Sequence, residues 1–342
     1  MPYHPTTRLN GPNKAREQPG EPVPTTHAQR ALTAATALTL AATPTAAHAR
    51  PDYPGHTTSH YITATGTPRD TAYADDAGCA AAATGQNGLR ILFLGTQEHP
   101  DRLRHPGTTA HTTTPRIPAG DTIDIAAAYA AGFTRCNDSG TTAHLALGVN
   151  NKDDGGISGR RAGRQWARIV DAAADRADTA DLTVTGAVDA EPSWSSPAWA
   201  RAWVDAYTAT TDRRLYAANS AGGCPTPGQS TTACNNGWTL DDIHHLATGA
   251  APTVHALPQI YRTDGIQARQ WAHVSAWGLR HRDQPLRAAG ALSQHTACTQ
   301  RGGCARTHNT PRDAWTQLRD ALDDHPTAPT PRLPYASDMR WP

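Results

Sequence analysis

The sequence predicts an α/β protein, folded as one (β/α)8 barrel of the TIM type. Short apolar runs of strand length alternate with segments of helical periodicity from residue 89 to the C-terminus. Strict alternation of this kind implies parallel strands joined by right-handed crossovers. Removing the first 49 of the 342 residues leaves 293, against about 250 for a typical barrel of this type. The prediction includes an irregular or incomplete barrel and places disulfide-closed loops on it.

The alternative fold is a doubly wound open sheet, which shows the same alternation. Its commonest functional form carries a G-x-G-x-x-G turn after the first strand, and none follows residues 89–94. We therefore assign the barrel to residues 89–342. Residues 50–88 are poor in large apolar groups and are predicted to be an irregular segment packed on the barrel. Within that segment, residues 60–64 are a candidate for a short early strand.

Seven strands and six helices are expected from residue 89 onward. Apolar runs of strand length lie at 89–94, 144–149, 182–188, 215–218, 254–261, 286–292 and 333–339. A helix is expected in each link between them, at 121–133, 160–174, 197–211, 240–247, 267–279 and 311–322.

Local signals support these helices. Asp121, with Asp124 three residues on, is typical of a helix start. The helix at 197–211 opens with a proline, and its aromatic residues at 199, 203 and 207 lie four apart, as in a core-facing stripe. Gly249 is a typical helix stop after residue 247.

The N-terminus predicts export. Residues 27–49 combine a basic start, a short apolar run and a small-x-small end, which predicts a secretory signal peptide cleaved after Ala49. An alanine-rich helix of the folded domain is the alternative. Residues 1–26 are expected to be a disordered extension or a misassigned start, and we hypothesise that translation begins at Val23. The protein is therefore predicted to be secreted and extracellular.

Composition limits the function classes. The formal net charge is +1 and no long charge run occurs, which argues against a nucleic-acid partner. Pro44 and the many Ala and Thr residues argue against a permanent membrane span in the one apolar segment. Only two lysines occur among 31 basic residues, which suggests a GC-rich, bacterial coding bias. We expect a monomer.

No cofactor or metal is predicted. The sequence contains no H-E-x-x-H, no G-x-S-x-G elbow and no P-loop. Asp241 and His245 lie one helical turn apart and could hold a metal, but no third ligand is evident and a solvated helix face is favoured.

Six cysteines follow the predicted cleavage site, and an even count in an exported chain suggests disulfides. Local spacing favours Cys224–Cys234 and Cys298–Cys304, each across a loop, which leaves Cys79–Cys136. Six cysteines allow about 15 pairings, so the sequence alone does not fix them. A zinc site competes, although the spacings are not of the paired C-x₂-C kind.

Polar residues end nearly every predicted strand. The active site of such barrels lies at the carboxyl ends of the strands. These ends carry Gln97, Glu98, Asn150, Asn151, Asp189, Glu191, Asn219, Gln259, Tyr261, Gln294 and Asp338. Amides and carboxylates bind sugar hydroxyls well, because they offer donors or acceptors in fixed planes. The predicted substrate-binding residues are Asn150, Asn219, Gln259, Tyr261, Trp194 and Gln294, although polar residues commonly end strands in any protein.

Asp189 and Glu191 are the strongest candidates for catalysis. They lie two apart at the end of a strand that Pro192 terminates, so their side chains point the same way. Glycoside hydrolysis needs two carboxyls, about 5 Å apart in retaining enzymes and about 6.5–9.5 Å apart in inverting ones, and this spacing could satisfy either. Glu191 looks the better acid and Asp189 its partner. Two surface acids or a salt-bridged pair are the alternatives.

Tryptophans divide into two predicted groups. Those on the crossover helices are expected in the core, namely Trp166, Trp199, Trp203, Trp271 and Trp315. Trp194 and Trp238 lie beside the predicted barrel mouth and could stack on a sugar ring.

Several of these segments resemble a known family. Residues 187–194, the Asn219–Cys224 turn, residues 258–261, Gln270-Trp271 and Ser337-Asp338 resemble an uncharacterised family of secreted actinobacterial proteins with a glycoside-hydrolase-like barrel. More distantly, the D-x-E of a central strand and the acid of the last strand resemble family 25 lysozymes. That resemblance implies Glu191 as general acid, Asp189 as its partner and Asp338 as a further catalytic acid. Those enzymes also carry an Asp after the first strand, where this chain has Gln97 and Glu98.

The sequence thus predicts a secreted glycoside-hydrolase-like protein acting on a carbohydrate, with cell-wall glycan as a candidate. The alternative is a non-catalytic secreted barrel that binds glycan or protein at the cell envelope. A third reading is a secreted structural protein with a vestigial cleft.

Overall fold

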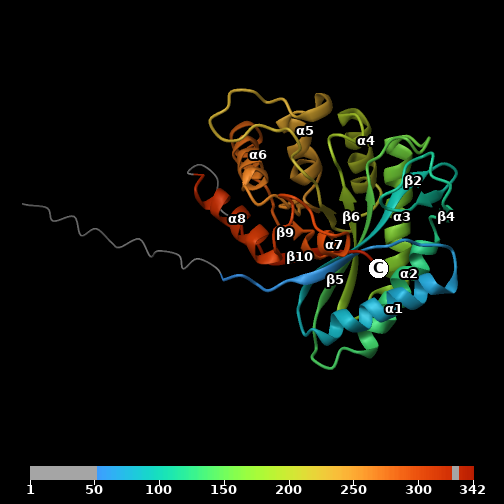
Figure 1. Ribbon diagram of the computed structural model, residues 1–342. Helices are drawn as coiled ribbons and strands as arrows, with labels where there is room; N and C mark the ends of the chain where they lie inside the picture. Colours follow the sequence, from blue (N-terminus) through green and yellow to red (C-terminus); the bar gives the residue numbers. More distant parts are fainter. Residues whose placement is uncertain (1–51, 326–330) are drawn as a thin grey trace, which may run out of the picture. The chain divides into compact units, whose positions relative to one another are not determined.

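Eight parallel strands close into a barrel in the computed structural model, which describes residues 52–325 and 331–342 (Figure 1). The strand order is β8-β7-β6-β5-β2-β1-β10-β9. Parallel bridges from Ala256 to Ala288 and from Gln259 to Leu292 join β8 to β9 and complete the closure. The predicted barrel is therefore confirmed. The expected signal peptide and N-terminal extension lie outside the described residues.

The barrel strands are β1 (Thr57–Tyr61), β2 (Gly88–Glu98), β5 (Ala143–Asn150), β6 (Leu182–Asp189), β7 (Leu215–Ala217), β8 (Val254–Ala256), β9 (Gly290–Ser293) and β10 (Tyr335–Arg340). The helices are α1 (Pro68–Ala83), α2 (Asp121–Arg135), α3 (Gly159–Ala177), α4 (Pro197–Thr208), α5 (Leu240–His244), α6 (Ile266–Arg282), α7 (His295–Gln300) and α8 (Pro311–Asp323). A 3-10 turn, η1 (Asn235–Gly237), precedes α5, and a π-helical turn, η2 (His245–Gly249), follows it. None of these helices is long and apolar enough to cross a membrane.

The segment expected to be irregular, residues 50–88, contains the first strand–helix unit, β1 and α1. Two of the inward-facing side chains of β1, Thr57 and Ser59, are polar, and the Ser59 hydroxyl bonds that of Ser337 at 2.7 Å. Helix α1 packs on α2 through small residues, because a Cβ at Gly78 would lie 2.0 Å from the Tyr129 carbonyl oxygen. Neither element shows the apolar pattern by which strands and helices are recognised in sequence.

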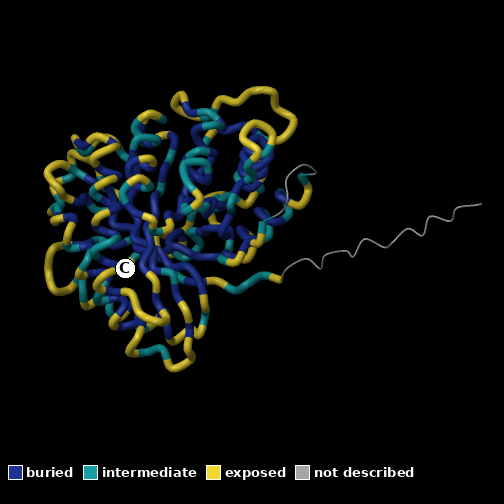
Figure 2. The backbone as a smooth tube through the Cα atoms, turned by 180° about the vertical axis from the view of Figure 1, so that it is seen from behind, coloured by how far each residue is buried: buried dark blue, intermediate teal, exposed yellow. Residues whose placement is uncertain are grey.

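Two apolar layers stabilise the barrel. Inside it, alternate strand residues such as Ile91, Ala187 and Leu292 pack together. Between strands and helices lies the larger layer, in which four of the five crossover tryptophans are buried and the fifth, Trp199, is half-buried. Figure 2 shows the buried strands at the centre and the exposed loops and outer helix faces around them.

Strand β2 continues past the barrel rim into a hairpin that the sequence did not predict. Residues 96–98 pair antiparallel with β3 (Arg102–Arg104), which pairs in turn with β4 (Ile117–Pro118). Gly95 makes this possible: its φ is +101°, and a Cβ there would lie 2.0 Å from the Arg104 carbonyl oxygen. The hairpin brings the loop after β3 over the barrel mouth.

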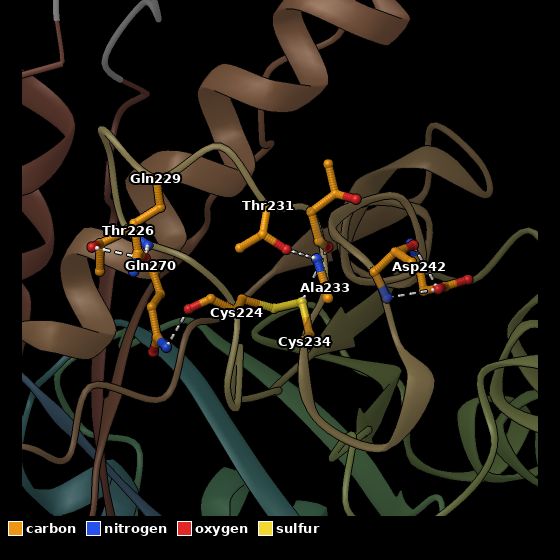
Figure 3. Close-up of a disulfide and its surroundings, with 10 residues drawn as sticks. Cys224, Thr226, Gln229, Thr231, Ala233, Cys234, Asp242 and Gln270 are labelled. Atoms are coloured by element: carbon orange, nitrogen blue, oxygen red, sulfur yellow. Dashed lines mark hydrogen bonds between the residues drawn. A yellow bond between two sulfur atoms is a disulfide. The ribbon is translucent and has the colours of Figure 1, made fainter. Parts of the chain in front are cut away.

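Three disulfides form: Cys224–Cys234 and Cys298–Cys304, which local spacing favoured, and Cys79–Cys136, the pair that was left. No cysteine of the described residues is free. Figure 3 shows Cys224–Cys234, where the Gln270 side chain donates to the Cys224 carbonyl oxygen at 2.7 Å. Cys79–Cys136 instead joins α1 to the end of α2, across 57 positions of sequence.

We predict that the disulfides contribute to stability in the order of the loops they close. The sequence separations are 57, 10 and 6, for which loop entropy gives about 4, 3 and 2 kcal/mol. The free energy of unfolding in urea should fall in this order in three double Cys→Ser variants, with the Cys79/Cys136 variant the most destabilised. Thiol titration of the denatured, unreduced mature protein is the control, and two or more free thiols would contradict the pairing.

Candidate active site

The site begins with the backbone just after β6. Two amides hold this turn: Asn151 donates to the Glu191 carbonyl oxygen at 3.0 Å and accepts from the Glu191 N–H at 2.9 Å. Asn219 accepts from the Ala190 N–H at 2.9 Å. Both amides belong to the predicted strand-end set. Their role is to fix the orientation of Asp189 and Glu191.

The two carboxyls have different partners. Gln259 donates from Nε2 to Asp189 at 2.8 Å. Ser220 donates its backbone N–H to Glu191 at 3.0 Å, and its hydroxyl donates to the other oxygen of the same carboxylate. The Asp189 and Glu191 carboxyls also interact with each other, and each affects the pKa of the other. Two carboxyls that interact in this way favour a state in which one of them carries a proton.

The surroundings place that proton on Asp189. Burial raises the pKa of both carboxyls, and the charge of Glu191 raises the pKa of Asp189 further, to well above its ordinary value. The two donors from Ser220 oppose the rise in the pKa of Glu191, because they bond its ionised form. The sequence favoured Glu191 as the acid, whereas these contacts favour Asp189.

A cavity of about 190 Å³ opens beside the pair at the barrel mouth. Aromatic and small residues form most of its wall, which consists of Tyr61, Phe93, Gly95, Pro106, Gly107, Asn150, Lys152, Asp189, Trp194 and Trp341. Asp189 lines the cavity and Glu191 does not. The carboxyl with the more strongly raised pKa is therefore the one that a ligand would meet.

The aromatic wall is continuous. The rings of Tyr61 and Trp341 stack at 4.2 Å between centroids, and Phe93 stacks on Tyr61 at 6.2 Å. Arg301 covers Trp341, with its guanidinium carbon 3.6 Å from the ring centroid. Burial raises the pKa of both the Tyr61 and the Tyr261 phenols. Trp341 is covered by Tyr61 on one face and by Arg301 on the other, so the stack makes this wall apolar and holds its rings in place.

One ammonium group reaches the cavity. Lys152 Nζ lies 5.0 Å from the centroid of the Trp194 ring and 3.4 Å from the Thr108 carbonyl oxygen. Trp194 therefore presents one of its faces to a cation. Asn150 accepts from the Thr96 hydroxyl at 3.0 Å and from the Lys152 backbone N–H at 3.2 Å, so it links β2 to this part of the wall.

Three predicted residues serve elsewhere. Asp338 faces away from the barrel interior and caps α7: it accepts from the N–H groups of His295 and Thr296 at 2.8 and 3.0 Å and from two hydroxyls. Gln294 donates to the Thr307 carbonyl oxygen at 3.3 Å and does not line the cavity. Trp238 is fully buried, so it cannot stack on a sugar.

Glu98, Asp241 and His245, which the sequence analysis also considered, all form ion pairs. Glu98 forms ion pairs with Arg104 at 3.2 Å and Arg116 at 3.0 Å. Asp241 pairs with Arg201 and Arg282, and His245 with Asp205. In the part of the chain that the structure describes, no three His, Cys, Asp or Glu residues gather as a metal site would require.

Sequence reasoning missed several cavity residues. Tyr61 and Trp341 come from the first strand and the chain's last residues, and Pro106 and Gly107 from the unpredicted hairpin. Ser220 directly follows Asn219, and only Asn219 was predicted as a site residue. Lys152 carried one usable signal, since it is one of only two lysines in the chain.

Comparisons with known proteins add little to this geometry. A scan against protein-family models finds no match, and a search of curated proteins finds none either. Among solved structures, the chain is similar to a sugar phosphate isomerase/epimerase from Parabacteroides distasonis, with a TM-score of 0.37 and 10% identity over 84% of this chain and 88% of that one.

Two mannanases are similar at the same level. For the endo-1,4-beta-mannanase of Rhizomucor miehei the TM-score is 0.38, with 10% identity over 84% of this chain and 85% of that chain. For the beta-1,4-mannanase of the sea hare Aplysia kurodai it is 0.34, with 10% identity over 84% and 88%. At these scores the likeness carries no functional argument. The strand order defines the protein as a closed β/α barrel, and its candidate active site is the Asp189–Glu191 pair.

We predict that Asp189→Asn stabilises the protein increasingly as pH rises. The pKa of Asp189 is raised in the folded state, so its contribution to stability is greatest below its unfolded-state pKa of about 3.9 and is lost as pH rises towards the folded-state value. The new amide can donate to Glu191 and accept from Gln259, as the protonated acid does. Urea unfolding at pH 4 to 8 measures the difference from wild type.

Asp212→Asn is the matched control, because Asp212 is exposed and precedes β7 at the opposite end of the barrel. Its difference from wild type should not change with pH. If the Asp189→Asn difference were equally flat, Asp189 would not be the protonated member of the pair.

Proposed function

We propose that this is a secreted, glycoside-hydrolase-like protein that acts on a carbohydrate at the barrel mouth. One observation carries the proposal: a half-buried pair of carboxyls with raised pKa values lies at a cavity with aromatic residues in its wall. Aromatic rings bind sugar faces, and a carboxyl kept protonated at neutral pH is the proton donor that glycoside cleavage requires. Cell-wall glycan is the substrate class that the sequence resemblance suggests, and export would bring the protein to it.

In this proposal the pair acts as one acid. We assign the two carboxyls one shared role, because their interaction favours a single proton on the pair, and not the separate acid and nucleophile of retaining enzymes. Asp189 gives its proton to the leaving oxygen as the bond from that oxygen to the sugar carbon breaks. Water then supplies a hydroxyl to the sugar carbon and returns a proton to the pair. Glu191 keeps Asp189 protonated between turnovers.

A non-catalytic barrel that binds glycan is the second candidate. Two observations favour it: the absence of a separate nucleophilic carboxyl from the described cavity wall, and the two Ser220 donors that already satisfy Glu191. In such a protein the carboxyl pair would bind sugar hydroxyls. The cavity and its aromatic wall would be used in the same way.

We predict that Asp189→Asn lowers turnover by about 10²- to 10⁴-fold, which is the usual contribution of general acid catalysis. Glu191→Gln should have a different effect. It removes the charge that raises the pKa of Asp189, so the alkaline limb of the pH–rate profile should move to lower pH. The assay is release of reducing ends from purified peptidoglycan and a panel of polysaccharides, measured from pH 4 to 9.

Two controls accompany this assay. Asp212→Asn should leave turnover unchanged, and each variant should bind glycan as wild type does, because the aromatic wall is intact. If Asp189→Asn only shifted the pH profile while Glu191→Gln abolished turnover, the two roles would be reversed. If wild-type protein bound glycan without releasing reducing ends, the binding barrel would be correct.

A further inference from the structure

We infer that the cavity selects a sugar that carries a carboxylate, and that Lys152 pairs with this carboxylate. The inference rests on the proposed function, in which the cavity binds a carbohydrate, and specifies the chemical class of that carbohydrate. Two observations support it: the position of the Lys152 ammonium in the cavity wall, and the hydrogen bonds and ion pairs of the charged groups near it.

Lys152 forms no ion pair with any residue that the structure describes. No carboxylate among these residues lies within 4.0 Å of its ammonium, and its one hydrogen bond, to the Thr108 carbonyl oxygen, is long at 3.4 Å. By contrast, the neighbouring Arg104 is paired with both Glu98 and Asp154, at 3.2 and 2.5 Å. Charged groups that lose water are normally paired, so an unpaired ammonium in a cavity wall is a candidate for ligand recognition.

The acids nearest the cavity do not supply this partner. The pKa of Asp189 is raised, which favours its neutral form, and the Glu191 carboxylate accepts two hydrogen bonds from Ser220. Burial lowers the pKa of the Lys152 ammonium most, and the charge of Arg104 lowers it further, while Asp154 and Asp189 oppose this from beyond ion-pair distance. A ligand carboxylate would offset both effects, because an opposite charge in a partly buried site favours the charged amine.

Trp194 fixes the direction of the ammonium. The ring lies under Nζ at 5.0 Å, a geometry that holds a cation in place without neutralising it. A neutral sugar that stacked on this face would have to displace Lys152. An acidic sugar can instead leave this ring face to Lys152 and place its carboxylate on the ammonium, because Lys152 and the aromatic wall line one cavity.

Lysine is also the less usual choice in this chain. Arginine provides 29 of the 31 basic residues, and Lys152 is the only lysine in the part that the structure describes. An ammonium is a compact point charge with three donors, whereas a guanidinium is a broad planar fork. In a cavity of about 190 Å³, the smaller head group leaves room for a sugar ring beside it.

The test uses two pairs of sugars that differ by a carboxylate. N-acetylmuramic acid is compared with N-acetylglucosamine, and trigalacturonate with the same trisaccharide after reduction of its carboxyls to alcohols. Wild-type protein should bind at least one acid about 10- to 100-fold more tightly than its neutral partner, as expected for a hydrogen bond between charged groups. Lys152→Met should remove that preference, and Lys152→Arg should retain part of it. Calorimetry at low and high salt measures each affinity.

The controls separate this inference from the proposed function. Arg164→Met removes an exposed positive charge on α3, away from the cavity wall, and should leave the preference unchanged. Equal binding of acid and neutral partner by wild type, or a preference that survives in Lys152→Met, would overturn the inference and leave the proposed function in place. If neither the four sugars nor the polysaccharide panel bound, both would be overturned.

Discussion

The interaction between two half-buried carboxyls determines how the barrel mouth is built. Two ionised carboxylates that interact in a partly buried site repel each other, which favours a state in which one is neutral. Ser220 stabilises the charge on Glu191, and Gln259 donates to Asp189. These contacts come from the ends of strands β6, β7 and β8, and they depend on the closed register of these strands. The closed barrel therefore brings the residues of the site together.

The fold was largely predictable because most of it rests on local patterns. Seven strands and their crossover helices appear as apolar runs and helical periodicity, and the cysteine pairs follow from short spacings. The first unit, β1 and α1, was not recognised, because its contacts are hydroxyl pairs such as Ser59–Ser337 and the close backbone approach at Gly78. Contacts of that kind depend on a distant partner and leave no periodic signal.

The site was predictable only in part. The Asp189–Glu191 pair and its amide partner Gln259 follow from strand ends, since parallel strands bring these ends together. Lys152 and Trp341 lie outside the strands, so their meeting at one cavity depends on the paths of loops and of the chain's end. The sequence also could not show which carboxyl has the more strongly raised pKa. Burial raises the pKa of Glu191, and the hydrogen bonds from Ser220, which are visible only in the folded structure, oppose that rise.

Asp338 shows why an acid at a strand end is ambiguous in sequence. Side chains alternate along a strand, and Ser337 and Met339 face the barrel interior, so Asp338 must face the surrounding helices. There it meets backbone N–H groups at the start of α7, which satisfy both its oxygens. Asp189 has the opposite parity, in line with Ala187, and meets a second carboxyl instead. An acid bound by backbone donors stabilises the fold, whereas an acid facing inward with an incomplete set of donors retains a proton that it can give to a ligand.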